Sequence, residues 1–270
     1  MPELIELNSS KHKGLKVREN CSVELAAKQQ ITRLRATEVG RAAANFPVFF
    51  TRGSQDGALV LSAFTCFENG QNMFIRDGQW QGTYQSSVMQ TYPFFLMRSP
   101  SDEKNHTIGI DENNQAFSKE EGELLFDDNG KTSMQLSRAK TLLEADIKND
   151  INTYQFAKKL EELALLKIID LIVQYQDGAS QTITGLITID EDKLNALSAE
   201  QLHGLNQQGY LVQIHALLIS IYQLNLLIQK QNARSDLPKV SQLKIEVAKD
   251  RAAAWVSTDY FRLSWKIWAG

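Results

Sequence analysis

The spacing of apolar residues divides this chain into two halves with different predicted structures. In the first half, short runs rich in Val, Phe, Leu and Ile alternate with polar turn segments, a pattern typical of strands. Beyond residue 134, apolar residues recur at helical spacing, so helices are expected to dominate the second half. The predicted strands of the first half are 30–34, 47–51, 58–66, 73–75, 79–81, 94–97, 107–111 and 123–126.

The second half also contains a predicted hairpin. Apolar residues at helical intervals predict two helices, at 135–148 and 152–164. After them, 167–175 and 181–189 are strand-like runs on either side of the turn dipeptide Asp177-Gly178. We therefore expect two helices followed by a strand–turn–strand unit.

A long apolar helix is predicted from Tyr210 to about Asn232, and it approaches the length of a membrane span. Four polar residues interrupt its apolar segment, at Gln213, His215, Gln223 and Asn225. Because polar groups without partners are costly in hydrocarbon, a core helix of a soluble protein is the favoured interpretation. The chain is therefore not expected to span a membrane.

Together these patterns predict an α+β fold, with a mainly antiparallel sheet from the N-terminal half packed by helices of the C-terminal half, plus a C-terminal strand. Residues 1–235 are expected to form a single domain, and 236–270 a C-terminal extension that begins at the linker Asp236-Leu237-Pro238. The strand expected in this extension either closes the sheet of its own domain or adds to another subunit or partner, which would give a homo-oligomer. Its period-two pattern consists of Phe261, Leu263, Trp265 and Ile267.

Composition narrows the class of protein. At 270 residues, with 43% hydrophobic and 23% charged residues, the chain resembles an ordinary globular protein that needs no disulfides to hold a core. Its formal charge of −3 argues against a nucleic-acid binder. The N-terminal residues show no basic segment followed by an apolar one, so a cytoplasmic location is expected, with signal-independent export to the cell surface as the alternative.

The stretch 72–97 concentrates aromatic residues around a turn. Asp77-Gly78 fits a type I′ hairpin turn, because both residues tolerate positive φ angles. Its aromatic side chains are either part of the core or the wall of a ligand pocket. The candidate ligand-binding residues are Trp80, Tyr84, Tyr92 and Phe94 from this stretch, together with His215.

Several segments carry a family resemblance. FPVFF (46–50), GQNMFIRDGQW (70–80) and TYPFFLM (91–97) follow one another as do the fPivF, geNlFvdxdGxW and rYPFxl segments of the bacterial SapC family. The similarity covers roughly residues 30–230, and the last 35 or so residues fall outside it. It continues through LLFDDNGKTS (124–133), through 165–197, and through LHGLNQQGYLVQIHALLIS (202–220).

The resemblance implies a protein of undefined biochemical role. The family is named for a surface-layer-associated protein and is distinct from the peptide-transporter permease of the same name. Its genes often occur beside those for outer-membrane TonB-dependent receptors and tryptophan-halogenase-like proteins. One departure from the family pattern is Ser86, where a proline usually follows two residues after the tyrosine that matches Tyr84.

Motifs for catalysis are missing, so no catalytic residue, cofactor or metal site is predicted. The Asn129–Thr132 segment lacks the earlier glycine of a phosphate loop, since residue 125 is Leu125. The four histidines have no zinc-ligand spacing. An enzyme site assembled from scattered residues stays open as an alternative, with His203 and His215 as its weak candidates.

These observations leave three hypotheses for function. The leading one is a non-enzymatic accessory or small-molecule-binding protein with an aromatic pocket, linked through the family context to outer-membrane uptake or halogenase-like systems. The second is a surface-layer-associated structural protein that self-assembles through its C-terminal strand. The third is the enzyme with a scattered site.

Overall fold

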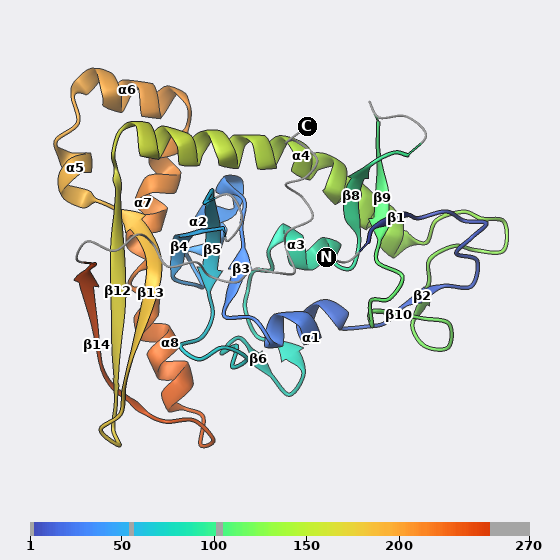
Figure 1. Cartoon of the computed structure of the whole chain (residues 1–270), viewed down its shortest axis with the longest axis horizontal. Coiled ribbons are helices and arrows are strands. Elements are labelled where there is room, and N and C mark those ends of the chain that lie inside the picture. The colour runs from blue at the N-terminus through green and yellow to red at the C-terminus, as the bar shows by residue number, and fades with distance from the viewer. Residues whose placement is uncertain (1–2, 54–56, 101–104, 249–270) are drawn as a thin grey trace.

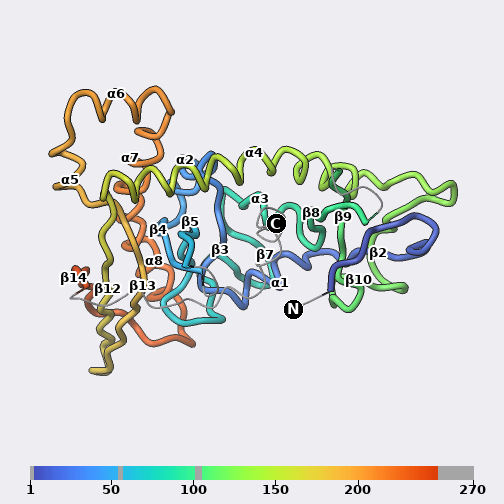
Figure 2. The backbone as a smooth tube through the Cα atoms, turned by 45° about the horizontal axis from the view of Figure 1, so that its top comes forward, coloured from blue at the N-terminus to red at the C-terminus, as the bar shows by residue number. Residues whose placement is uncertain are grey.

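Two hydrophobic cores share one long helix in this protein. The computed structural model describes residues 3–53, 57–100 and 105–248. Figure 1 shows a six-stranded sheet with its helices on one side of the molecule and a region of short strands on the other. Helix α4 (Met134–Glu162) runs along both (Figure 2).

The main sheet is antiparallel at every pairing and takes strands from both halves of the chain. In space the strands follow the order β14-β12-β13-β4-β5-β3. The α+β class and the antiparallel pairing predicted from the sequence are confirmed. The strands are β3 (Ile31–Arg33), β4 (Val48–Arg52), β5 (Leu59–Phe64), β12 (Leu166–Tyr175), β13 (Ser180–Ile189) and β14 (Val240–Val247).

The hairpin of β12 and β13 forms where the sequence predicts it. Its ten-residue strands are rich in Ile, Leu, Val and Thr, which suit a pleated sheet. Between them Gly178 takes a φ of 88°, a conformation that glycine adopts without steric cost. At the other predicted turn, Asp77 and Gly78 have φ angles of 52° and 71°, so the type I′ assignment is confirmed.

The two helices predicted at 135–148 and 152–164 are wrong as separate elements, because α4 is continuous over 29 residues. No glycine or proline lies between Met134 and Glu162, so nothing in the backbone chemistry ends the helix. Ser133 caps its start, with its hydroxyl accepting from the backbone N–H of Leu136 at 3.2 Å.

The single helix predicted over 210–232 is instead two, α7 (Tyr210–Ser220) and α8 (Gln223–Asn232). The Ser220 hydroxyl donates back to the Leu217 carbonyl at 2.7 Å and accepts from the Val48 N–H of β4 at 3.0 Å. A serine that bonds to its own preceding turn competes with the helical ladder. The helix is interrupted at the next two residues, Ile221 and Tyr222.

The remaining elements are short. The helical ones are α1 (Cys21–Ala27), η1 (Ala36–Glu38), α2 (Val39–Ala42), α3 (Ser87–Thr91), α5 (Glu191–Asn195) and α6 (Ala199–Gln207). The strands outside the main sheet are β1 (Ile5–Glu6), β2 (Lys16–Val17), β6 (Ile75–Arg76), β7 (Gln79–Trp80), β8 (Phe95–Arg98), β9 (His106–Ile110), β10 (Phe117–Ser118) and β11 (Glu123–Leu124).

Each core takes part of α4. We call the core around the six-stranded sheet the sheet core; Phe156, Ala157 and Leu160 of α4 belong to it. We call the core around the short strands β1, β2 and β8–β11 the small core; it contains Leu136, Ala139 and Leu143 of α4. The predicted strand pattern at 261–267 lies outside the described residues.

Candidate functional site

The predicted aromatic residues do not meet at one site. Trp80 and Tyr84 pack against the sheet core, where the Trp80 ring lies 5.9 Å from that of Phe46. Tyr92 and Phe94 belong to the small core. His215 is exposed on α7. Ligand binding by any of these residues stays a prediction, and the five do not form a common pocket.

A small cavity lies beside Trp80. Its volume is about 10 Å³, enough for roughly one water molecule. Among its lining residues is Thr32, whose buried hydroxyl has no partner in the part of the chain that the structure describes. A metabolite would fit there only if the walls moved.

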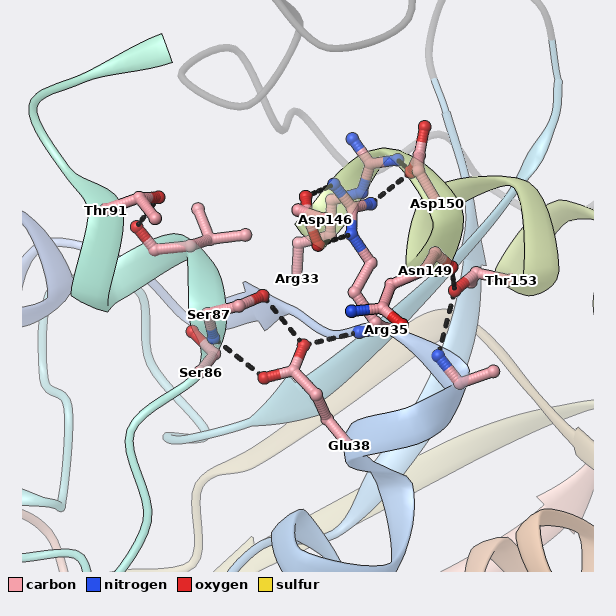
Figure 3. A network of polar contacts seen from close by, with 12 residues as sticks. Arg33, Arg35, Glu38, Ser86, Ser87, Thr91, Asp146, Asn149, Asp150 and Thr153 are labelled. Atoms are coloured by element: carbon pink, nitrogen blue, oxygen red, sulfur yellow. Dashed lines mark hydrogen bonds and ion pairs between the residues drawn. The ribbon is translucent and has the colours of Figure 1, made fainter. Parts of the chain in front are cut away.

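Between the two cores lies a cluster of buried charges (Figure 3). Arg35, 2% exposed, precedes η1 and forms a two-pronged ion pair with Asp146 of α4, with Nε donating at 2.8 Å. A further Arg35 nitrogen donates to Asp150, one helical turn along α4. Arg33 donates to the same Asp150 oxygen at 2.9 Å. Because Asp146 and Asp150 are four residues apart, one helix face presents both carboxylates to the arginines.

Glu38 forms the other half of this cluster. Its carboxylate accepts from the backbone N–H of Arg35 at 2.7 Å, from the backbone N–H of Ser87 at 2.7 Å and from the Ser87 hydroxyl at 3.0 Å. The Tyr84 hydroxyl donates a fourth hydrogen bond. Four donors compensate the cost of burying this carboxylate.

The surroundings of Arg35 and Tyr84 in the cluster fix the protonation state of each side chain. Burial opposes the charge of Arg35, but the hydrogen bond and charges of Asp146 and Asp150 outweigh it and raise the pKa of the guanidinium. Burial, and then the charge and hydrogen bond of Glu38, raise the pKa of the Tyr84 hydroxyl. Tyr84 therefore stays a neutral donor and Arg35 a cation across the physiological range.

Chemically, this arrangement holds elements together. The acidic groups of the cluster are engaged by donors from the protein itself, and α4, η1 and α3 all contribute. Ser86, at the position where the family usually has proline, caps α3 by accepting from the Met89 N–H at 3.3 Å. Its φ of −62° is one that a proline also adopts, so both residues can start this helix.

Sequence reasoning missed the cluster, although two signals for it exist. Arg33, at the end of a predicted strand, and Arg35, two residues on, alternate with the apolar Leu34 and Ala36, and a charge in such a setting needs a buried partner. Asp146 and Asp150 share a helix face four residues apart. Neither pair of residues shows that the other is its partner, because more than 100 residues separate the two pairs in the chain.

Other titratable groups are dispersed. His12, buried in the region of the small core, shares a hydrogen bond of 3.0 Å with Glu112. His203 and His215 are exposed on different helices, α6 and α7. Within residues 3–53, 57–100 and 105–248, no three His, Cys, Asp or Glu side chains are grouped as metal ligands.

The outer surface of α7, and of the break between α7 and α8, exposes apolar side chains. Val212 is 70% exposed, Ile219 62% and Tyr222 74%, and the exposed His215 lies between them. The opposite side, including Ile214, Leu217, Leu224 and Leu227, is buried in the sheet core. By length and composition, Tyr210–Asn232 is the one helical stretch in the described residues apolar enough to cross a membrane.

Comparison with known proteins supplies one match. No curated protein and no solved structure matches the sequence. The family model of SapC matches residues 7–227, which contain the buried residues of the small core, those of the sheet core apart from Val240, and the charged cluster. The match extends the resemblance seen in the aromatic segments to most of the chain. This chain therefore belongs to the SapC family.

Proposed function

We propose that this protein is a non-enzymatic accessory protein that binds a partner protein through the exposed face of α7 and the break that follows it. The observation that carries this proposal is a solvent-exposed stripe of Val212, His215, Ile219 and Tyr222. From Tyr210 to Gln229 the sequence contains no Asp, Glu, Lys or Arg. A helix that faces only water normally carries charges on its outer side, and exposed apolar surface of this kind favours an interaction site.

The spacing of the stripe suggests the kind of partner. On α7, Val212, His215 and Ile219 follow intervals of three and four, as do the seam positions of a coiled coil, and Tyr222 follows in the break before α8. Such a seam accepts the apolar side of an amphipathic helix. A charged or nucleic-acid partner would find no ion-pairing group there, and an anionic membrane surface would lack the basic residues that usually attract it.

The small-molecule form of the accessory hypothesis has weaker support. Of the candidate aromatic residues, Trp80 lines the cavity, but the cavity is the size of a water molecule. The first partners to test are the proteins that the family context suggests, namely the outer-membrane receptors and halogenase-like proteins encoded near family members.

The test is a binding measurement on a purified pair. A photo-crosslinker at position 219 in the native host would identify the partner by mass spectrometry. The affinity of that partner is then measured for the wild-type protein and for the Val212→Ser, Ile219→Ser, Tyr222→Ser triple variant. Loss of three apolar anchors is expected to weaken binding by roughly a hundredfold or more.

A matched control removes exposed apolar residues elsewhere. Leu124→Ser with Met134→Ser changes two such side chains in the region of the small core and should leave the affinity unchanged. Equal affinity of the triple variant and the wild type would refute the proposal. If the wild-type protein binds lipid vesicles and the triple variant does not, the surface binds a membrane and not a protein partner.

A further inference from the structure

Strand β14 forms one edge of the six-stranded sheet among the described residues. It is eight residues long and contains no proline or glycine. Ile245 is 42% exposed and Val247 63% exposed. Natural edge strands are usually short, bulged or covered, because a free row of N–H and C=O groups readily pairs with another strand.

The hydrogen bonds of β14 fix which residues point outward. Just after β14, the Ala248 N–H donates to the Ile168 carbonyl of β12 at 3.0 Å. Strand β14 has a bulge at Ser241. Beyond it, backbone groups alternate in direction along the strand, so the even-numbered residues from Gln242 to Ala248 bond to β12. The N–H and C=O groups of Leu243, Ile245 and Val247 therefore face away from the sheet.

We propose that two copies of this chain pair through β14, antiparallel, about a two-fold axis at Ile245. In this register Ile245 lies opposite Ile245 of the second copy, and Leu243 lies opposite Val247. The backbone N–H and C=O groups of all three residues face away from the sheet. Each opposed pair therefore exchanges two backbone hydrogen bonds, about six in total. The result is one sheet that continues across both copies.

Charge complementarity selects this register. With the axis at Ile245, Lys244 of each copy lies opposite Glu246 of the other, so the dimer has two such pairs. Both are at non-hydrogen-bonded positions, where side chains come closest. A shift of the axis to residue 244 would oppose two Lys244 side chains, and a shift to 246 would oppose two Glu246 side chains. An axis at 243 would set Lys244 against Gln242 and Ile245 against Ser241, with no ion pair.

The protomer itself leaves a charge for the second copy to balance. Within the sheet, Glu246 lies directly opposite Asp170 of β12, a pairing of like charges. Lys244 of the second copy would lie on the free side of Glu246 and offset this repulsion. Pairing through β14 uses a different surface from the stripe on α7 and the break that follows it, so the two proposals stand or fall separately.

Charge reversal tests the register with the full-length chain. Lys244→Glu and Glu246→Lys each replace two attractive contacts with two repulsive ones, so each is expected to weaken the dimer by roughly tenfold or more in analytical ultracentrifugation. The double exchange, K244E with E246K, restores the attraction and should recover the wild-type dissociation constant. Both side chains are exposed, so thermal unfolding should show that every variant folds.

A crosslink tests the axis directly. Ile245→Cys would place the two introduced thiols opposite each other, within disulfide range, so oxidation should give a covalent dimer. Val247→Cys is the matched control, because its opposite residue is Leu243 and its own copy lies about four residues further along the strand. The native Cys21 and Cys66 are buried and should not compete.

Two results would overturn the proposal. One is a wild-type chain that stays monomeric at all concentrations while Ile245→Cys fails to crosslink. The other is a dimer that both single charge reversals leave unchanged, which would place the interface elsewhere. Recovery by the double exchange and selective crosslinking at 245 would establish it.

Discussion

The region of the sheet core and the region of the small core are built by different means. The sheet region depends on long ladders, such as the β12–β13 hairpin with ten residues in each strand. In the small-core region, β1, β2, β10 and β11 have two residues each. Its turns depend on single side chains, for example Asp127, which accepts from the Lys131 N–H at 2.8 Å. A repeating apolar pattern specifies the first kind of structure, and individual polar residues specify the second.

Helix α4 connects these two regions, and the Arg35 cluster holds the helix at the boundary between them. Buried ion pairs are costly to assemble, and removal of one partner leaves the other charge without compensation. The cluster should therefore matter most for how the two regions stay together, and the predictions below separate its contribution from that of each core.

The largest expected effect is that of Arg35→Met. Loss of the guanidinium leaves Asp146 and Asp150 partly buried and without their main partner, which should cost about 3–5 kcal/mol in the free energy of unfolding. Urea unfolding followed by circular dichroism measures this. The control is Lys140→Ala on the exposed side of the same helix, with an expected change below about 0.5 kcal/mol. A similar small loss for both variants would show that the cluster does not hold the helix.

A matched pair of leucines on α4 compares the two regions themselves. Leu136 lies in the small core and Leu160 in the sheet core, and both are fully buried. Each Leu→Ala change should cost about 2–5 kcal/mol of local packing. Hydrogen exchange should then differ: Leu160→Ala is expected to speed exchange throughout the sheet, whereas Leu136→Ala speeds it in β8 and β9 and leaves β12 protected. Uniform acceleration by both variants would mean that the protein unfolds as one unit.

The same division explains how far the sequence predicts the structure. The hairpin 167–189 is predicted because period-two alternation and a turn dipeptide are local signals. The break between α7 and α8 is not, since it depends on the Ser220 hydroxyl meeting Val48, 172 residues away in the chain. The continuity of α4 is missed for the opposite reason. Asn149, Asp150 and Asn152 resemble a helix boundary, although Asp150 is held by the buried Arg35.

The candidate site follows the same rule. Trp80 and Tyr84 are aromatic residues near a predicted turn, which is a local signal. The structure does bring them together, with the Trp80 N–H donating to the Tyr84 carbonyl at 3.1 Å. Tyr92 and Phe94 are close to them in sequence but belong to the small core. The charged cluster could not be predicted, because a local pattern does not show which distant carboxylate will meet a buried arginine.

A smaller effect is expected from Tyr84→Phe. The change removes one of four donors to Glu38 and should cost roughly 1–2 kcal/mol, because the ring is half-exposed and solvent lessens the loss. It should also alter the alkaline limb of the stability profile. The folded pKa of Tyr84 lies above its usual value of 10.0, so its contribution is full below about pH 10 and is lost as the pH rises through the folded pKa. Unfolding measured at pH 9 and pH 11 should show a gap between wild type and variant that narrows at the higher pH.

The smallest expected effect is a difference in cysteine labelling, which reports on each region in turn. Burial raises the pKa of the Cys66 thiol to about 11 and also raises the pKa of Cys21, so little of either thiol is ionised at neutral pH. Both should react slowly with a maleimide in the native protein. In rising urea, Cys21 in the small core is expected to react before Cys66 in the sheet core, because short strands and single side-chain bonds open more readily than long ladders. The variants Cys21→Ala and Cys66→Ala each leave one thiol to follow by mass spectrometry. Reaction of both thiols at the same urea concentration would show that α4 and its arginine cluster couple the two regions into one cooperative unit, despite their different construction.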